Sequence, residues 1–113
     1  MELHYSELQN NIRLIKLIGT LDITGVGRIE TKFTDHCSGD NPRVLVDLSD
    51  VEFLASIGIR LLVRNAKSIS SRAGRMVLLS PTSEIRSVLE ISGIPAIIPI
   101  YNGLESAETV LLA

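Results

Sequence analysis

The chain has 113 residues, of which 11 are basic and 13 acidic, so its net charge near neutral pH is −2. Hydrophobic residues make up 45% and charged residues 21%, which supplies enough apolar material for one folded domain and excludes a disordered chain. The near-neutral balance argues against binding to nucleic acid, which requires a basic surface. Two Tyr and two Phe are also too few for a base-stacking platform.

The single cysteine, Cys37, cannot form an internal disulfide, which is typical of a reducing compartment. The chain does not begin with the basic segment followed by an apolar segment that is typical of a signal peptide. It also contains no apolar run of about 18 residues, the length that a membrane-spanning helix needs. From the sequence we therefore expect a cytoplasmic protein that does not cross a membrane.

The first predicted elements are two strands and a helix. The β-branched run Ile12–Ile18 ends at Gly19 and predicts a buried strand, and Glu2–Glu7 is a second strand that pairs antiparallel with it through the turn at residues 9–11. A helix follows, because apolar residues recur at helical spacing, and its predicted inner face consists of Val26, Ile29, Phe33 and Cys37.

Further along the chain the same alternation continues. Arg43–Leu48 is a short apolar run typical of a central parallel strand, and Arg75–Leu79 is another strand that follows Gly74. Between them lies a second helix, with the apolar positions Ile59, Leu62, Val63, Ala66 and Ile69.

The last part of the sequence predicts two helices and one strand. Ser80 followed by Pro81 indicates an N-cap and first helical position, and this helix ends at Gly93. Residues 96–100 form a short edge strand, because Pro99 cannot donate to a ladder, and a final helix follows with Leu104, Ala107 and Leu111 inward. The alternation predicts one α/β domain with a four- or five-stranded mixed sheet covered by about four α-helices.

Topology brings two polar residues to one edge of this sheet. Asp22 follows the first long strand and Ser56 follows the strand that begins at Arg43. If a right-handed crossover joins these strands, they run parallel and their carboxyl ends meet. Asp22 could bind a partner or only cap its helix. Ser56 could be a phosphorylation site at the positive end of a helix or only an N-cap, and Gly58 could permit close packing there.

The residues around this edge form two motifs. Gly19-Thr20-Leu21-Asp22 is the first, and residues 46–59, which read Val-Asp-Leu-Ser-Asp-Val-Glu-Phe-Leu-Ala-Ser-Ile-Gly-Ile, form the second. Together they resemble the STAS-domain family of bacterial anti-sigma factor antagonists. The resemblance extends over nearly the whole chain, which implies a STAS domain over residues 1–113.

The resemblance implies a partner-switching regulator that is not an enzyme. The unphosphorylated protein would bind an anti-sigma factor that is also a serine kinase, and phosphorylation of the serine matching Ser56 would break the complex. A PP2C-type phosphatase would reverse the modification. The partner-binding residues that the motifs imply, together with the exposed helix positions beside them, are Asp22, Ala55, Ser56, Ile57, Gly58, Ile59, Arg60 and Arg64.

The sequence also departs from the family pattern. Ala55 stands where the family has Asp, and Ile57 where it has Ser or Thr, so a carboxylate and a hydroxyl beside Ser56 are absent. These departures favour the alternative of a non-phosphorylated scaffold or accessory module in a signalling or transport complex. Arg60 and Arg64 could meet an acidic partner or form a solvated helix face.

No chemistry of another kind is indicated. The chain has no phosphate-binding loop of the Gly-Lys-Ser/Thr type, and Gly25-Val26-Gly27 lacks the third glycine of a dinucleotide site. His4 and His36 are not placed to activate Ser56, and no three or four ligands can be assembled for a metal. We expect no cofactor and no metal.

Overall fold

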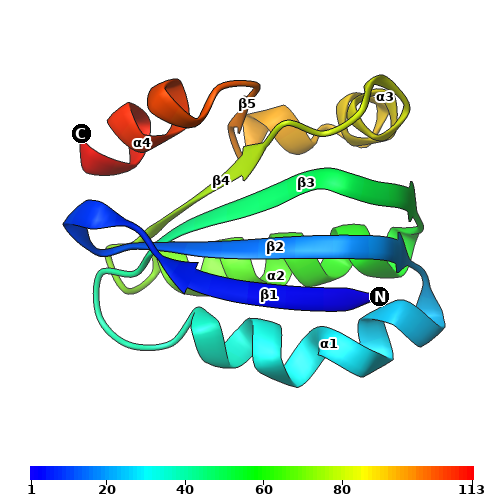
Figure 1. Ribbon diagram of the computed structural model, residues 1–113, viewed down its shortest axis with the longest axis horizontal. Helices are drawn as coiled ribbons and strands as arrows, with labels where there is room; N and C mark the ends of the chain where they lie inside the picture. The colour runs from blue at the N-terminus through cyan, green and yellow to red at the C-terminus, as the bar shows by residue number, and fades with distance from the viewer.

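The computed structural model describes residues 1–113 as a five-stranded sheet with four α-helices (Figure 1). The elements in chain order are β1 (Glu2–Glu7), a 3₁₀ turn (Gln9–Asn11), β2 (Ile12–Leu21), α1 (Ile23–His36), β3 (Arg43–Leu54), α2 (Ser56–Ser70), β4 (Arg75–Leu79), α3 (Ser83–Ile91), a second 3₁₀ turn (Ile94–Ala96), β5 (Ile100–Tyr101) and α4 (Leu104–Leu112). The predicted α/β architecture is therefore confirmed.

The sheet is mixed, with strand order β1-β2-β3-β4-β5. β1 pairs antiparallel with β2 through a tight turn in which Asn10 and Asn11 both adopt positive φ angles, of 64° and 62°. Asparagine tolerates this left-handed conformation better than most residues. The other neighbouring strands pair in parallel, so the predicted parallel arrangement of β2 and β3 is confirmed.

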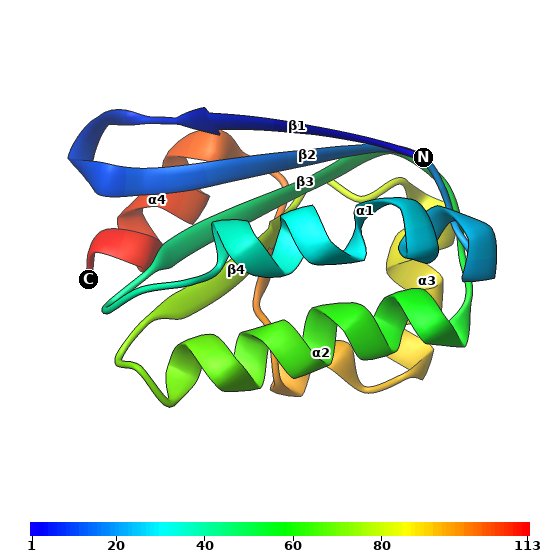
Figure 2. The ribbon, with the colours of Figure 1, turned by 90° about the horizontal axis from the view of Figure 1, so that it is seen from below.

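Two helices cover one face of the sheet and one covers the other. α1 and α2 lie side by side beneath the sheet (Figure 2), and α4 packs against the opposite face near β4. α3 and the second 3₁₀ turn add apolar residues to the core that α1 and α2 cover. α4 also reaches over the start of β2, where Ile12 and Leu14 pack in the same cluster as Ala107 and Leu111.

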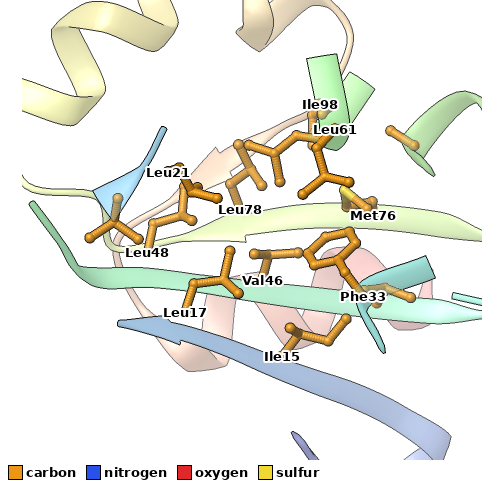
Figure 3. Close-up of a cluster of buried hydrophobic side chains, with 14 of the residues drawn as sticks. Ile15, Leu17, Leu21, Phe33, Val46, Leu48, Leu61, Met76, Leu78 and Ile98 are labelled. Atoms are coloured by element: carbon orange, nitrogen blue, oxygen red, sulfur yellow. The ribbon is translucent and has the colours of Figure 1, made fainter. Parts of the chain in front are cut away.

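The larger core lies between the sheet and α1 and α2. Figure 3 shows Leu17 of β2 and Val46 of β3 beside Phe33 of α1, and all three side chains are completely buried. Cys37 is buried in the same cluster, as its place on the apolar face of the helix predicts. A smaller cluster under α4 includes Leu45, Val77 and Leu111.

The predicted start of α3 was wrong by two residues. Thr82, not Ser80, is the N-cap, and its hydroxyl oxygen accepts a hydrogen bond from the Ile85 N–H at 3.3 Å. Ser80 instead adopts a left-handed φ of 51° and donates from its hydroxyl to the Asn102 carbonyl at 2.6 Å. Its backbone N–H bonds to the Tyr101 carbonyl at 2.8 Å, so contact with β5 holds Ser80 outside the helix.

The predicted strand at residues 96–100 was also largely wrong. Only Ile100–Tyr101 forms β5, and a 3₁₀ turn occupies Ile94–Ala96. Pro95 lies near the start of this turn, where a missing N–H costs little. The Pro99 carbonyl nevertheless accepts a hydrogen bond from the Leu78 N–H at 2.9 Å, which is consistent with proline at the start of an edge strand.

Candidate functional site

The carboxyl ends of β2 and β3 meet at one edge of the sheet. Leu21 and Leu54, the last residues of the two strands, are register partners, and the Ala55 N–H donates to the Leu21 carbonyl at 3.0 Å. Asp22 follows the first strand and Ser56 the second, and α1 and α2 begin there side by side (Figure 2). The structure therefore brings these two residues to one edge, as topology predicted.

Asp22 is the N-cap of α1. Its backbone is extended, and its Oδ1 atom accepts a hydrogen bond from the Gly25 N–H at 2.7 Å. Its carbonyl also accepts from the Val26 N–H at 2.8 Å, which is the first bond of the helix. The capping interpretation of Asp22 is thus confirmed, and the half-buried carboxylate still lies at the molecular surface.

Ser56 is not an N-cap, so that interpretation was wrong. Ala55 is the last extended residue, with φ −90° and ψ 168°, and its carbonyl accepts from the N–H groups of Gly58 and Ile59 at 3.0 and 3.2 Å. Ser56 is already the first helical residue of α2, is exposed, and makes no side-chain hydrogen bond within the chain. Its hydroxyl therefore has no structural task and is open to a partner.

Gly58 keeps the start of α2 close to the end of β2. A Cβ atom at this position would lie 2.8 Å from the Leu21 Cβ, 2.9 Å from the Leu54 Cδ1 and 3.0 Å from the Leu21 carbonyl oxygen. Gly25 of α1 is comparably confined, since a Cβ there would lie 2.0 Å from the Thr20 carbonyl oxygen. Both helices can begin against the strand ends only because these residues lack side chains.

The other predicted site residues spread from this edge along α2. Ile57 and Ile59 are half-buried and pack against the core, so they present only part of their side chains. Arg60 is exposed. Arg64 lies one helical turn further and donates from Nη2 to the Glu30 Oε2 of α1 at 2.7 Å, which ties the two helices together on their outer side.

Sequence reasoning missed two exposed apolar side chains at this edge. Ile23, the first residue of α1, is 76% exposed, and Phe53, near the end of β3, is 54% exposed. The pairing of β2 and β3 shifts by one residue here, because Gly19 pairs with Val51 but Thr20 pairs with Phe53. This bulge turns the Phe53 ring outward, and no local sequence signal marks it. We call the surface formed by Asp22, Ile23, Phe53, Ala55 and Ser56 the Asp22–Ser56 surface.

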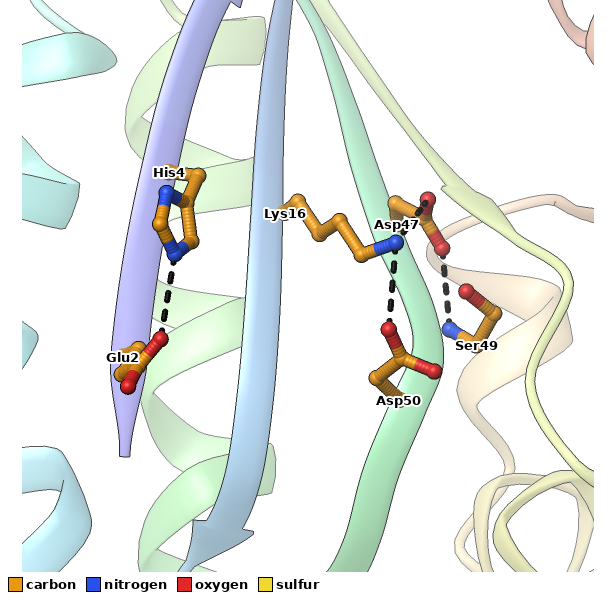
Figure 4. Close-up of polar contacts among 6 residues, drawn as sticks. All are labelled: Glu2, His4, Lys16, Asp47, Ser49 and Asp50. Carbon is orange, nitrogen blue, oxygen red and sulfur yellow. Dashed lines mark hydrogen bonds and ion pairs between the residues drawn. The ribbon is translucent and has the colours of Figure 1, made fainter.

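A second polar cluster lies on the open face of the sheet (Figure 4). Lys16 of β2 forms an ion pair with Asp50 of β3 at 3.1 Å, and Asp47 lies 4.0 Å from the same amine. The ion pair with Asp50 raises the pKa of Lys16. Asp47 also accepts a hydrogen bond from the Ser49 N–H at 2.9 Å. These contacts join neighbouring strands on the surface, and the cluster contains one amine between two carboxylates, a set that favours no metal ion.

Across the whole chain no group of three or more His, Cys, Asp or Glu side chains is arranged to hold a metal ion. No helix is both long and apolar enough to span a bilayer.

The chain is similar to known proteins over most of its length. A family model described as STAS domain matches residues 6–107. The Bordetella bronchiseptica protein BtrV is 29% identical over 91 residues, which cover 80% of this chain and 78% of BtrV. The anti-sigma F factor antagonist of Lysinibacillus sphaericus is 29% identical over 82 residues, or 72% of this chain and 70% of that protein.

Solved structures agree with this result. The anti-sigma factor antagonist SpoIIAA in its unphosphorylated form superposes with a TM-score of 0.78 at 23% identity, and the match covers 96% of each chain. The phosphorylated form of the Bacillus protein SpoIIAA superposes with a TM-score of 0.71 at 21% identity, covering 96% of this chain and 99% of that one. Because the sequence identities to these two structures are 23% and 21%, the structural similarity establishes the fold alone.

Proposed function

Because the chain belongs to the STAS domain family and its curated relatives include anti-sigma factor antagonists, we propose that it binds an anti-sigma factor through the Asp22–Ser56 surface and that phosphorylation of Ser56 breaks this complex. One structural observation supports this proposal more strongly than any other. The Ser56 hydroxyl is exposed in the first turn of α2 and has no hydrogen-bond partner within the chain. A protein kinase can therefore reach it without unfolding the helix.

A phosphate at Ser56 would suit the local electrostatics of the folded chain. α2 has no side-chain cap, so N–H groups of its first turn remain open to an anion. The modification adds about −1.5 to −2 charges, and the helix dipole partly compensates them. The fold would tolerate both states, while the charge of the partner-binding surface would change greatly. SpoIIAA, which has the same fold, has been solved in both forms.

The surface also offers apolar anchors for a partner. Ile23 and Phe53 are exposed near the strand ends where Ser56 lies, and Arg60 extends the surface along α2. Exposed aromatic and aliphatic side chains beside a polar group are typical of protein interfaces. A phosphate among them would be costly to desolvate in a complex, which explains how one modification would release the partner.

Phosphorylation is tested by intact-mass measurement. The partner in this proposal is an anti-sigma factor with serine-kinase activity, and a PP2C-type phosphatase would restore the unmodified chain. Incubation with the cognate kinase and ATP should add one phosphate to the chain and none to Ser56→Ala. Ser83→Ala is the matched control, because Ser83 is likewise exposed at the first position of a helix. The assignment to Ser56 would be contradicted if the kinase phosphorylated both variants, or if it phosphorylated neither.

Binding is tested separately by calorimetry with the anti-sigma factor. Ser56→Ala should bind within about threefold of the unmodified chain, whereas Ser56→Asp should bind at least about tenfold more weakly, a loss of roughly 1.4 kcal/mol.

The second candidate function is a scaffold that uses the same surface without phosphorylation. Ala55 and Ile57 favour it, because the motif carboxylate and second hydroxyl are absent. Equal binding by Ser56→Ala and Ser56→Asp, with no phosphate added by the kinase, would select this candidate.

A further inference from the structure

The strand β1 forms a free margin of the sheet. It pairs with β2 over all six residues from Glu2 to Glu7 in an uninterrupted register, and no strand lies on its other side. In an edge strand, alternate residues direct their N–H and C=O groups outward, where another strand can pair with them. The opposite margin, β5, has only two residues. β1 is therefore the margin that can accept another strand.

A groove runs between this margin and α1. Its volume is about 270 Å³, and apolar side chains of Met1, Leu3 and Ile29 contribute to its lining. Further along β1, the Tyr5 ring stacks on the His36 ring, with the centroids 3.8 Å apart and the planes 4° from parallel. β1 and α1 thus lie against each other along the length of the strand, with the groove at the end where β1 begins.

Two cations border this groove. Arg28 and Lys32 lie one helical turn apart on α1, both exposed, and neither lies within 4.0 Å of a carboxylate oxygen. Glu2 also contributes to the lining, but its carboxylate contacts the His4 ring nitrogen at 3.1 Å (Figure 4). The groove therefore offers positive charge beside unpaired backbone groups, which is complementary to an extended acidic segment.

A second copy of the chain fits this margin poorly. Antiparallel pairing of two β1 strands about a two-fold axis perpendicular to the sheet would place only side chains of the same face opposite each other, with His4 or Tyr5 paired with itself, so no directly opposed residues of opposite charge would join the two copies. The same axis would put both α1 helices on one face, so that the Arg28 and Lys32 pairs would approach each other. Charge thus disfavours a homodimer through β1.

We propose that the β1–α1 groove binds an extended acidic segment of a partner protein, which pairs with β1 as an added strand and directs its carboxylates to Arg28 and Lys32. Main-chain hydrogen bonds to β1 would supply affinity, and the two cations would select the charge of the segment. The proposal concerns a surface distinct from Ser56 and is independent of its phosphorylation.

The test uses three fluorescent octapeptides and the intact chain. The first alternates Thr and Glu, the second alternates Thr and Lys, and the third repeats the first with N-methyl groups at alternate residues, which prevent strand pairing. Only the Thr-Glu peptide should bind by fluorescence anisotropy, and its affinity should fall as salt concentration rises. In ¹⁵N correlation spectra its binding should shift amides of β1 and of α1 around Lys32.

Charge-reversal variants complete the test. Lys32→Glu should lower the affinity of the chain for the Thr-Glu peptide by about fivefold or more, and R28E/K32E should lower it by about tenfold or more. Lys67→Glu is the matched control, since it reverses an exposed lysine on α2 and should change affinity less than about twofold. The proposal is overturned if the Thr-Glu peptide fails to bind, if the Thr-Lys or N-methyl peptide binds equally, or if the shifted amides lie on another surface.

Discussion

At the scale of single residues, two helical glycines show how local surroundings decide what a residue does. Gly58 in α2 has Leu21 and Leu54 atoms within 3.0 Å of the position that a Cβ would occupy, whereas Gly27 in α1 has nothing within 4 Å. Glycine weakens a helix at both positions, by about 1 kcal/mol relative to alanine. Only at Gly58 does packing against the strand ends offset this weakness.

The prediction is that Gly58→Ala lowers the free energy of unfolding by about 1–2 kcal/mol, because overpacking outweighs the gain in helix propensity. Gly27→Ala should raise it by about 0.5–1 kcal/mol. Urea denaturation of both variants measures the difference. A stabilised Gly58→Ala variant would mean that α2 can move away from the end of β2 at little cost.

At the scale of elements, α1 is held at both ends by polar contacts from other parts of the chain. Asp22 caps its first turn. At its other end, Arg13 of β2 donates to the His36 carbonyl at 3.0 Å, and Arg72 donates to the Cys37 carbonyl at 2.9 Å. Cations at the carboxyl end and a carboxylate at the amino end both complement the helix dipole. The position of α1, and with it the Asp22–Ser56 surface, is therefore well defined.

The role of Asp22 can be divided into capping and charge. Asp22→Ala should destabilise the chain by about 1 kcal/mol in urea denaturation, because the Gly25 N–H loses its acceptor. Asp22→Asn retains an acceptor oxygen and should cost only a few tenths of a kcal/mol. If the carboxylate also contacts the partner, both variants should bind the anti-sigma factor more weakly. If Asp22→Asn binds the anti-sigma factor as tightly as the wild-type chain does, the carboxylate has no role in binding and Asp22 serves only as a helix cap.

At the scale of the whole molecule, the buried thiol of Cys37 links folding to pH. Burial raises the pKa of Cys37 from its ordinary value of 9.0 to about 12, and the nearby cations Arg13 and Arg72 only partly oppose this effect. Between these two values the unfolded chain loses the thiol proton while the folded chain keeps it. Cys37 therefore contributes stability below about pH 9 that is lost progressively as the pH rises towards 12.

The unfolding free energy should accordingly fall by about 1 kcal/mol more for the wild-type chain than for Cys37→Ala when the pH rises from about 8 to about 10. Each protein is compared with itself at the two pH values, so the cavity left by Cys37→Ala cancels. Urea denaturation monitored by circular dichroism supplies the values. Parallel pH profiles for the two proteins would show that the native thiol ionises as readily as the unfolded one.

The sequence by itself determined most of the elements and the meeting of Asp22 with Ser56 at one edge. The spacing of hydrophobic residues along the chain reflects which face of a helix or strand is buried, so it predicts the elements without coordinates. Parallel strands joined by helices end at a common edge of the sheet, so the meeting of Asp22 with Ser56 also follows from the order of the elements. Tertiary contacts decided the rest. Ser80 is held outside α3 by β5, Phe53 is turned outward by a bulge opposite Gly19 and Thr20, and Arg64 finds Glu30 on another helix. Each depends on partners distant in the sequence, whose approach is decided only when the sheet and helices pack.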